Sequence, residues 1–276
     1  MCGLKIAIQG ELGSNSHMAT LAMLGNADKL EIIACNVSAE VLAKVVSGAV
    51  NGAVLPIENS LHGSVAEHYD LLLELPVRIE RESLLRIRHN VIAMPGVRLT
   101  EVKRVMSHPV ALSQCRRFLM GHPEFQVVSF YDTAGSVKYL MAEGLHNVAG
   151  IAPELAAAEY GAEVLVAGVE DHAENYTRFH LVLREDAAVA SGVVDKMSVA
   201  FAIEHRPGTL VAALELLAAA GVDLTKIESR PVPGSPWEYV FYVDVRFEDV
   251  GKADAAVAAL HKHCRMVKVL GRYRAA

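Results

Sequence analysis

Five consecutive residues combine an amide, a hydroxyl, a fixed positive charge and an aromatic ring. They read Asn175-Tyr176-Thr177-Arg178-Phe179. A hydroxyl can hydrogen-bond to a leaving group, and the planar guanidinium of arginine matches a carboxylate. This set suits the turnover of a small substrate that carries several negative charges. Phe179, at its end, is more typical of a core position than of a substrate platform.

Polar candidates for substrate binding lie in loops that follow short apolar runs. These runs alternate with helical stretches, which is typical of an α/β fold with mostly parallel strands. Small-molecule sites in such folds form where strands end and helix N–H groups are free. The rule selects loops 10–16, 56–63, 107–109 and 132–134 as an anion-binding cradle. The candidate contacts in them are Ser16, Asn59, Ser60, Ser107 and Thr133, each with helix capping or a turn as its alternative role.

The hydrophobic periodicity predicts two regions joined by a linker at 185–196. The first is predicted to contain strands at 5–9, 52–56, 86–93, 104–107, 126–130 and 148–152, and helices at 16–24, 39–47, 64–73, 109–120, 134–143 and 153–160. The second is predicted to contain strands at 197–204, 223–230, 238–247 and 266–270, helices at 208–220 and 252–262, and a turn at 233–236. This β-α-β-β-α-β order is that of the ferredoxin-like fold. Its exposed sheet edge predicts pairing with a second copy.

Composition excludes several classes of protein. The 276 residues carry a formal net charge of −6 with no basic stripe, which argues against nucleic-acid binding. Four widely spaced cysteines fit neither a zinc site nor a redox dithiol. The sequence contains no signal peptide and no apolar run long enough to cross a membrane. We therefore expect a cytoplasmic protein that uses no cofactor and no metal.

Several motifs together resemble those of prephenate dehydratase with a C-terminal ACT domain, over almost the whole chain. Their order and spacing make the resemblance specific. In the first region they are Pro56-Ile57-Glu58-Asn59-Ser60, Gly63-Ser64-Val65, Ser107-His108-Pro109, Gln114-Cys115 and Asn175-Tyr176-Thr177-Arg178-Phe179. In the second they are Arg206-Pro207-Gly208-Thr209-Leu210-Val211 and Glu228-Ser229-Arg230-Pro231.

The resemblance implies a two-lobed, periplasmic-binding-protein-like (type II) catalytic region at 1–186, with crossings between lobes near Glu80 and Gly161, and a ferredoxin-like ACT domain at 197–276. The implied activity is that of a carbon–oxygen lyase (hydro-lyase), which converts prephenate to phenylpyruvate by decarboxylating dehydration. It also implies feedback regulation by L-phenylalanine in phenylalanine biosynthesis and a homodimer or homotetramer. The chorismate mutase segment that precedes this region in some relatives is not expected.

In that framework Thr177 is the hydrogen-bond donor to the departing hydroxyl, while Arg178 either binds a carboxylate or forms a structural salt bridge. Glu58 is expected to orient its neighbours, and the histidines at 17, 62, 68 and 108 to have structural or surface roles. Asn15 and Val110 depart from the family pattern. The implied substrate contacts are Ser16, Asn59, Ser60, Ser107, Thr133, Asn175 and Phe179. The implied effector contacts are Pro207, Gly208, Thr209, Leu210, Val211, Glu228, Ser229 and Arg230.

Two alternatives remain open from the sequence. One keeps the fold and changes the substrate to arogenate, the transaminated form, and Ala134 beside Thr133 lies in the region where the two substrates would be distinguished. The other is a non-catalytic two-lobed sensor of small molecules. The intact Thr177-Arg178-Phe179 run argues against the sensor, since a protein that only binds its ligand does not need this donor.

Overall fold

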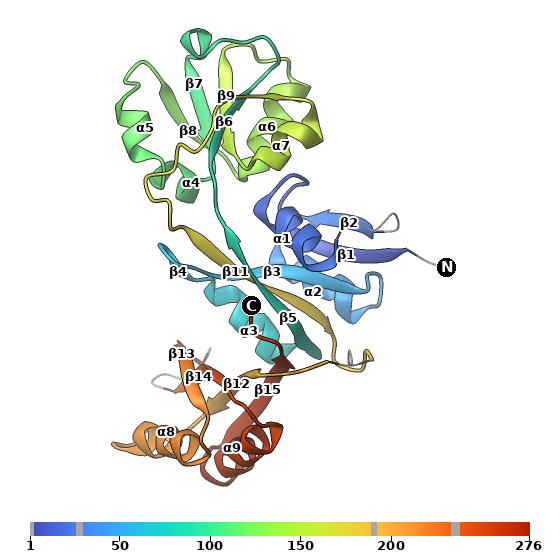
Figure 1. The fold of residues 1–276 in the computed structure, drawn as a ribbon, viewed down its shortest axis with the longest axis vertical. Coiled ribbons are helices and arrows are strands. Elements are labelled where there is room, and N and C mark those ends of the chain that lie inside the picture. Colours follow the sequence, from blue (N-terminus) through green and yellow to red (C-terminus); the bar gives the residue numbers. More distant parts are fainter. Residues whose placement is uncertain (1–2, 26–29, 189–191, 233–237) are drawn as a thin grey trace. The chain divides into compact units, whose positions relative to one another are not determined.

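The computed structural model describes residues 3–25, 30–188, 192–232 and 238–276, and the chain divides into two compact units (Figure 1). The first unit contains the residues up to Val65 together with Leu84–Phe179. The second contains Ala66–Ser83 and His180–Ala276. Strands β5 (Val77–Arg86) and β11 (Tyr176–Arg184) each contain a point where the chain passes from one unit to the other.

The N-terminal part of the first unit is built on a sheet whose central strand is parallel to its neighbours. Its elements are β1 (Leu4–Gln9), α1 (Asn15–Leu24), β2 (Leu30–Cys35), α2 (Ser38–Val46), β3 (Gly52–Asn59) and β4 (Gly63–Ser64). The strand order is β11-β3-β1-β2, and β1 is parallel to both β2 and β3. Ile6, Ala7 and Ile8 are at most 1% exposed, as expected for a parallel strand covered on both faces.

The rest of the first unit is built on a five-stranded sheet in the order β10-β6-β9-β7-β8. Its elements are β6 (Asn90–Ala93), the 3₁₀ helix η1 (Leu99–Glu101), β7 (Arg104–Ser107), α4 (Pro109–Ser113), α5 (Arg116–Met120), β8 (Gln126–Ser129), α6 (Thr133–Ala142), β9 (Val148–Ala152), α7 (Glu154–Tyr160) and β10 (Glu163–Val166). Strand β7 is parallel to β8 and β9, as predicted. Strand β6 is antiparallel to β9 and β10, so this sheet is mixed rather than entirely parallel.

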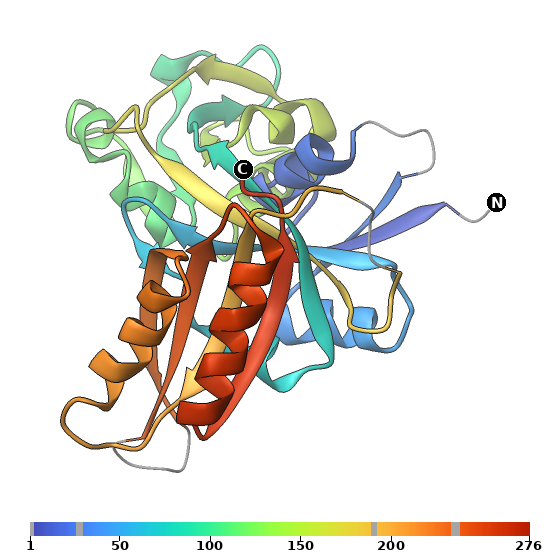
Figure 2. The ribbon, with the colours of Figure 1, turned by 60° about the horizontal axis from the view of Figure 1, so that its bottom comes forward.

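The second unit contains an antiparallel sheet with two helices on one face (Figure 2). Its elements besides β5 and β11 are α3 (Ala66–Glu74), β12 (Lys196–Ala202), α8 (Thr209–Ala219), β13 (Asp223–Pro231), β14 (Tyr239–Arg246), α9 (Val250–His263) and β15 (Met266–Tyr273). The order β13-β14-β12-β15, with antiparallel pairing throughout, confirms the ferredoxin-like prediction. Strand β15 also pairs with β5 at Gly271 and Ile79. A Cβ atom at Gly271 would lie 2.3 Å from Ile79 O, so this contact requires glycine.

Some predicted elements differ from those observed for local reasons. The helix predicted at 109–120 is two short helices, because Cys115 leaves helical geometry with φ −121° and ψ 28°. Strand β5 is absent from the prediction because its charged residues obscure the apolar alternation; Arg78 and Glu80 pair at 2.8 Å. The turn predicted at 233–236, and residues 189–191 of the predicted linker, lie outside the described residues. No helix among the described residues is both long and apolar enough to span a membrane.

Candidate functional site

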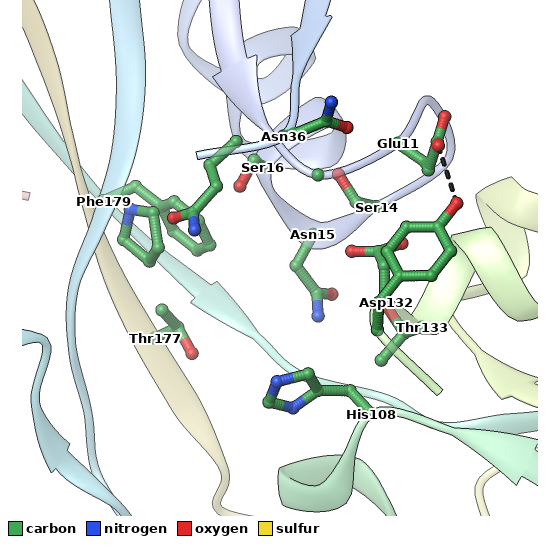
Figure 3. Close-up of a pocket in the computed structure, with 14 residues that line it drawn as sticks. Glu11, Ser14, Asn15, Ser16, Asn36, His108, Asp132, Thr133, Thr177 and Phe179 are labelled. Carbon is green, nitrogen blue, oxygen red and sulfur yellow. Dashed lines mark hydrogen bonds between the residues drawn. The ribbon is translucent and has the colours of Figure 1, made fainter. Parts of the chain in front are cut away.

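A cavity of about 520 Å³ opens in the first unit, and residues from all four predicted loops form its wall (Figure 3). The lining consists mostly of small polar, acidic and aromatic side chains. It comprises Gln9, Gly10, Glu11, Ser14, Asn15, Ser16, Asn36, Pro56, His108, Tyr131, Asp132, Thr133, Thr177 and Phe179. The predicted meeting of the four loops at one site is therefore confirmed, while their binding of an anion stays a prediction.

Two helix N-termini lie at the cavity because their capping residues line it. Ser14 Oγ caps α1 by accepting a hydrogen bond from the N–H three residues on, at 3.4 Å. Asp132 Oδ1 caps α6 by accepting from Gly135 N at 2.7 Å. Asn15 and Ser16 form the first turn of α1, whose N–H groups have no intrahelical acceptor. These N–H groups are suited to an anionic part of a substrate.

The loop before α1 is held in place by close packing and two hydrogen bonds. Gly13 has a φ of +80°, and a Cβ atom there would lie 2.7 Å from the Cα of Ala156 in α7. Its N–H donates to His17 Nδ1 at 2.9 Å, and burial lowers the pKa of His17, which favours the neutral ring that can accept. Tyr160 donates to Leu12 O at 2.8 Å. The first turn of α1 is thus fixed against α7.

Thr177 lines the cavity with 8% of its surface exposed, and the side-chain amide of Asn59 holds its hydroxyl. Asn59 Nδ2 donates to Thr177 Oγ1 at 2.9 Å and to Asn175 Oδ1 at 2.7 Å. Asn59 Oδ1 accepts from the N–H groups of Leu61 and His62, which fixes the end of the amide that faces Thr177. Because Thr177 Oγ1 accepts from Asn59, its own proton is available to another acceptor, such as a group in the cavity. The arrangement makes Thr177 an oriented hydrogen-bond donor.

The amide chain continues away from the cavity to two histidines. Gln114 Oε1 accepts from Asn175 Nδ2 at 3.0 Å and contacts His89 Nε2 at 2.7 Å. Gln114 Nε2 contacts His62 Nδ1 at 3.0 Å, so that nitrogen is the acceptor. His89 is 2% exposed, and burial lowers its pKa. A neutral His89 can donate from Nε2 to Gln114 Oε1, so that every hydrogen bond in this network has one donor and one acceptor.

Arg178 follows Thr177 in β11 and therefore lies on the other face of the strand. It does not line the cavity; its Nε lies 2.8 Å from Glu58 Oε1, and its side chain is 5% exposed. The structure thus favours the salt bridge among the two roles that the sequence leaves open for Arg178. Phe179 returns to the face of Thr177, lines the cavity and is almost fully buried, which fits its expected packing role.

The charged groups of the cavity are acidic. Burial raises the pKa of Glu11, but hydrogen bonds from Lys138 and Tyr131 outweigh it and hold the pKa below its ordinary value. Burial raises the pKa of Asp132, and the bond from the Gly135 N–H offsets only part of the effect. Among the residues that the structure describes, no lysine or arginine lines the cavity. No three His, Cys, Asp or Glu side chains of the described residues are grouped so that they could hold a metal ion.

The remaining predicted contacts have varied surroundings. Thr133 begins α6 and lines the cavity. The Ser60 hydroxyl accepts from Tyr176 N at 3.0 Å, and the Ser60 N–H donates to Tyr176 O at 2.8 Å, so Ser60 fixes the start of β11. Ser107 is fully buried and donates to Ile151 O. The structure therefore brings four predicted residues to the cavity wall, while the other five lie outside its lining. The four are Ser16, Thr133, Thr177 and Phe179, and the five are Asn59, Ser60, Ser107, Asn175 and Arg178.

Some lining residues are missing from the sequence prediction. Gln9 and Asn36 end or follow parallel strands, the place where the strand-end rule could have found them. Tyr131 and Asp132 lie at the edge of a selected loop, but no motif marks them. His108 lines the cavity and also caps α4, because its Nδ1 accepts from Val110 N at 3.2 Å.

A second, smaller cavity of about 150 Å³ lies in the second unit. The predicted effector contacts Gly208, Thr209, Leu210 and Val211 line it, whereas Pro207 does not. Glu228, Ser229 and Arg230 lie on β13 outside this lining. Arg230 instead pairs with Asp70 of α3 at 2.7 Å.

Two family models match separate parts of the chain. The family model described as prephenate dehydratase matches residues 6–187, and that of the ACT domain matches 198–263. The chain belongs to the prephenate dehydratase family. A curated relative is the chloroplastic arogenate dehydratase/prephenate dehydratase 2 of Arabidopsis thaliana, 35% identical over 282 residues that cover 98% of this chain and 72% of the relative.

Solved structures similar to this dehydratase-family chain extend over its full length. The prephenate dehydratase of Arthrobacter aurescens in complex with L-Phe is 33% identical, with a TM-score of 0.88, covering 99% of this chain and 90% of that one. A protein described as GqqA, a novel type of quorum quenching acylase, is 31% identical with the same TM-score of 0.88, covering 99% of this chain and 98% of that one. The ACT domain is thus shared together with the catalytic region.

Proposed function

We propose that the chain catalyses the decarboxylating dehydration of prephenate to phenylpyruvate, with Thr177 as the donor to the departing hydroxyl. The bond from the ring to its carboxylate breaks, carbon dioxide leaves, and the electron pair enters the ring. The ring C–O bond breaks at the opposite carbon, and the hydroxide leaves as the ring becomes aromatic. The observation that carries the proposal is the Asn59–Thr177 hydrogen bond at 2.9 Å, which leaves the threonine proton available to a substrate in the cavity. Positioned donors of this kind contribute about 10²–10⁴-fold.

The other predicted site residues position the donor or bind the substrate in this proposal. The N–H groups of the first turn of α1, with Ser16 and Thr133, bind substrate carboxylates. Asn59 and Asn175 orient Thr177, and Ser60 fixes the strand that carries it. Ser107 supports the sheet beneath the cavity, and Arg178, paired with Glu58, acts as a positioning residue.

The proposal also assigns 1–186 to catalysis and 197–276 to regulation by L-phenylalanine. Its support is the ACT family match and the relative whose structure contains L-Phe. The loop Gly208–Val211 lines a small cavity that suits an amino acid. The segment Glu228–Arg230 lies outside that lining, and we propose that it completes the effector site in a homodimer or homotetramer.

A second candidate substrate is arogenate, which the Arabidopsis relative's name includes beside prephenate. The acylase activity named for GqqA has less support here. A threonine nucleophile needs an adjacent general base. The partner of the Thr177 hydroxyl is the amide of Asn59, which cannot take up a proton.

The test is to incubate the purified protein with prephenate or arogenate and to follow phenylpyruvate or phenylalanine formation. We expect turnover that falls about 10²–10⁴-fold in Thr177→Ala with little change in substrate affinity. Turnover of neither substrate, or unchanged turnover by Thr177→Ala, would reject the proposal. L-Phenylalanine added to the wild type tests the regulatory half separately, since turnover that does not respond to it rejects only that half.

A further inference from the structure

The cavity wall carries negatively charged side chains that the dehydration step does not require. Glu11 and Asp132 line it, and no lysine or arginine in the described part of the chain does. Glu11 is compensated, because Lys138 Nζ and the Tyr131 hydroxyl each lie 2.8 Å from its carboxylate. A substrate with two carboxylates gains nothing from a further negative charge in this position.

Asp132 differs from Glu11 because no lysine or arginine of the described residues forms an ion pair with it. Its carboxylate accepts from the backbone N–H groups of Gly135 and Glu11. The nearby His108 accepts a hydrogen bond from Val110 N through its Nδ1. A carboxylate that is partly buried, held by backbone N–H groups and open to a cavity is suited to a cationic ligand.

The position of Asp132 beside the N-terminus of α1 specifies the kind of cation. An atom at the Cβ position of Gly10 would lie 2.7 Å from Asp132 Oδ2 and 3.9 Å from Ser14 Cβ, so the carboxylate and the helix cap approach one point. Figure 3 shows Asp132 next to Ser14, with one oxygen directed toward Asn15. Gly10, at φ +93°, leaves this approach open, because a side chain there would displace the carboxylate.

This pair of groups matches the two charges of a 2-amino acid. The first turn of α1 offers N–H donors for a carboxylate, and Asp132 offers an acceptor for an ammonium on the adjacent carbon. A 2-keto acid would place a carbonyl oxygen against the same carboxylate, and the two would repel. We propose that Asp132 is a specificity-determining residue that binds the substrate ammonium, so that the cavity prefers arogenate to prephenate. This inference rests on the proposed dehydratase function and names its substrate.

The test compares kcat/KM for arogenate and prephenate in the wild type and in Asp132→Asn. Asparagine keeps an oxygen to cap α6 and removes the charge. We expect the wild type to favour arogenate by about 10- to 100-fold, the size expected of a charged hydrogen bond. In Asp132→Asn the ratio should approach one, mainly through a higher KM for arogenate.

Asp249→Asn is the matched control, because Asp249 caps α9 in the same manner, accepting from Gly251 N at 2.9 Å, and lies in the other unit. It should leave the substrate ratio unchanged. Asp132→Ser, which also caps a helix, serves if the asparagine variant fails to fold. A wild type that favours prephenate, or a ratio unaffected by removing the charge, overturns the inference while the dehydratase function stands. A wild type that uses neither substrate overturns both.

Discussion

Asn59 Nδ2 lies 2.9 Å from Thr177 Oγ1, although 118 positions separate the two residues in the sequence. Asn59 ends β3 and Thr177 is the second residue of β11, and these strands are neighbours in the sheet of the first unit. The amide can only donate from Nδ2, so it defines the direction in which the threonine proton points. A weak acid such as threonine depends on this orientation for any catalytic effect.

Replacing Asn59 by aspartate tests this orientation with almost no change in shape. Aspartate keeps the oxygen that accepts from Leu61 N and His62 N but turns the donor into an acceptor. Thr177 would then donate to position 59 instead of to the substrate. We expect steady-state assays of Asn59→Asp to show kcat lowered about 10²–10³-fold.

The control for this change is Asn51→Asp, at a surface asparagine whose Oδ1 accepts from Lys5 N at 2.8 Å and which lies outside the cavity lining. It should retain wild-type kcat. Full activity in Asn59→Asp would show that the Thr177 proton is not directed by the amide, and the role assigned to that hydrogen bond would be wrong.

The ion pair between Arg178 and Glu58 leads to a prediction about stability. Arg178 is 5% exposed, and loss of its carboxylate partner would leave a buried cation with reduced compensation. We expect Glu58→Gln to lower the free energy of unfolding by about 2–4 kcal/mol, measured by urea denaturation. Glu40→Gln, which breaks the exposed pair with Lys44 at 3.4 Å, should cost less than about 0.5 kcal/mol. Equal effects of the two changes would contradict a structural role for the buried pair.

The polar motifs were the part of the site that the sequence could predict, because they are local. Thr177 and Phe179 belong to one run of residues, and Ser16 and Thr133 follow strand ends. The role of Asp132 could not be predicted, since it depends on which carboxylate Lys138 neutralises. Lys138 reaches Glu11 across 127 positions of sequence, and no local pattern records that choice.

The difference between local patterns and long-range contacts also explains which parts of the fold could be predicted. The ferredoxin-like region was predictable because each of its strands and helices has a clear period. The direction of β6 was not, because its partners β9 and β10 lie far along the chain and no local pattern records the pairing. The separation of Arg178 from the cavity follows from strand alternation, but only once β11 is known to be a strand.

The buried His89 predicts how stability depends on pH. Burial lowers its pKa below the ordinary 6.5, so the unfolded chain takes up a proton at higher pH than the folded one. The folded state therefore loses stability as pH falls below about 6.5, by up to about 1.4 kcal/mol per pH unit for this one group, and the loss ends below the folded pKa. His89→Gln, which keeps a donor for Gln114, should reduce the slope of unfolding free energy between pH 7.5 and 5.5. His146 is exposed, so His146→Gln is the control for removing a histidine. If the wild type and His89→Gln show the same slope of unfolding free energy against pH, His89 is not a source of the pH dependence.

Gly271 allows β15 and β5 to pair closely in the second unit, so replacing it should lower the stability of the protein. A Cβ atom there would lie 2.3 Å from Ile79 O and 2.7 Å from Ile79 Cβ, contacts that a backbone carbonyl cannot relieve without moving the strand. We expect Gly271→Ala to lower the free energy of unfolding by about 1–3 kcal/mol. Gly251→Ala, in the first turn of α9 with its nearest contact at 3.4 Å, should change it little. Thermal unfolding of the two variants measures the difference in their stability. Equal unfolding midpoints would mean that β15 and β5 do not approach closely enough at Gly271 to require glycine.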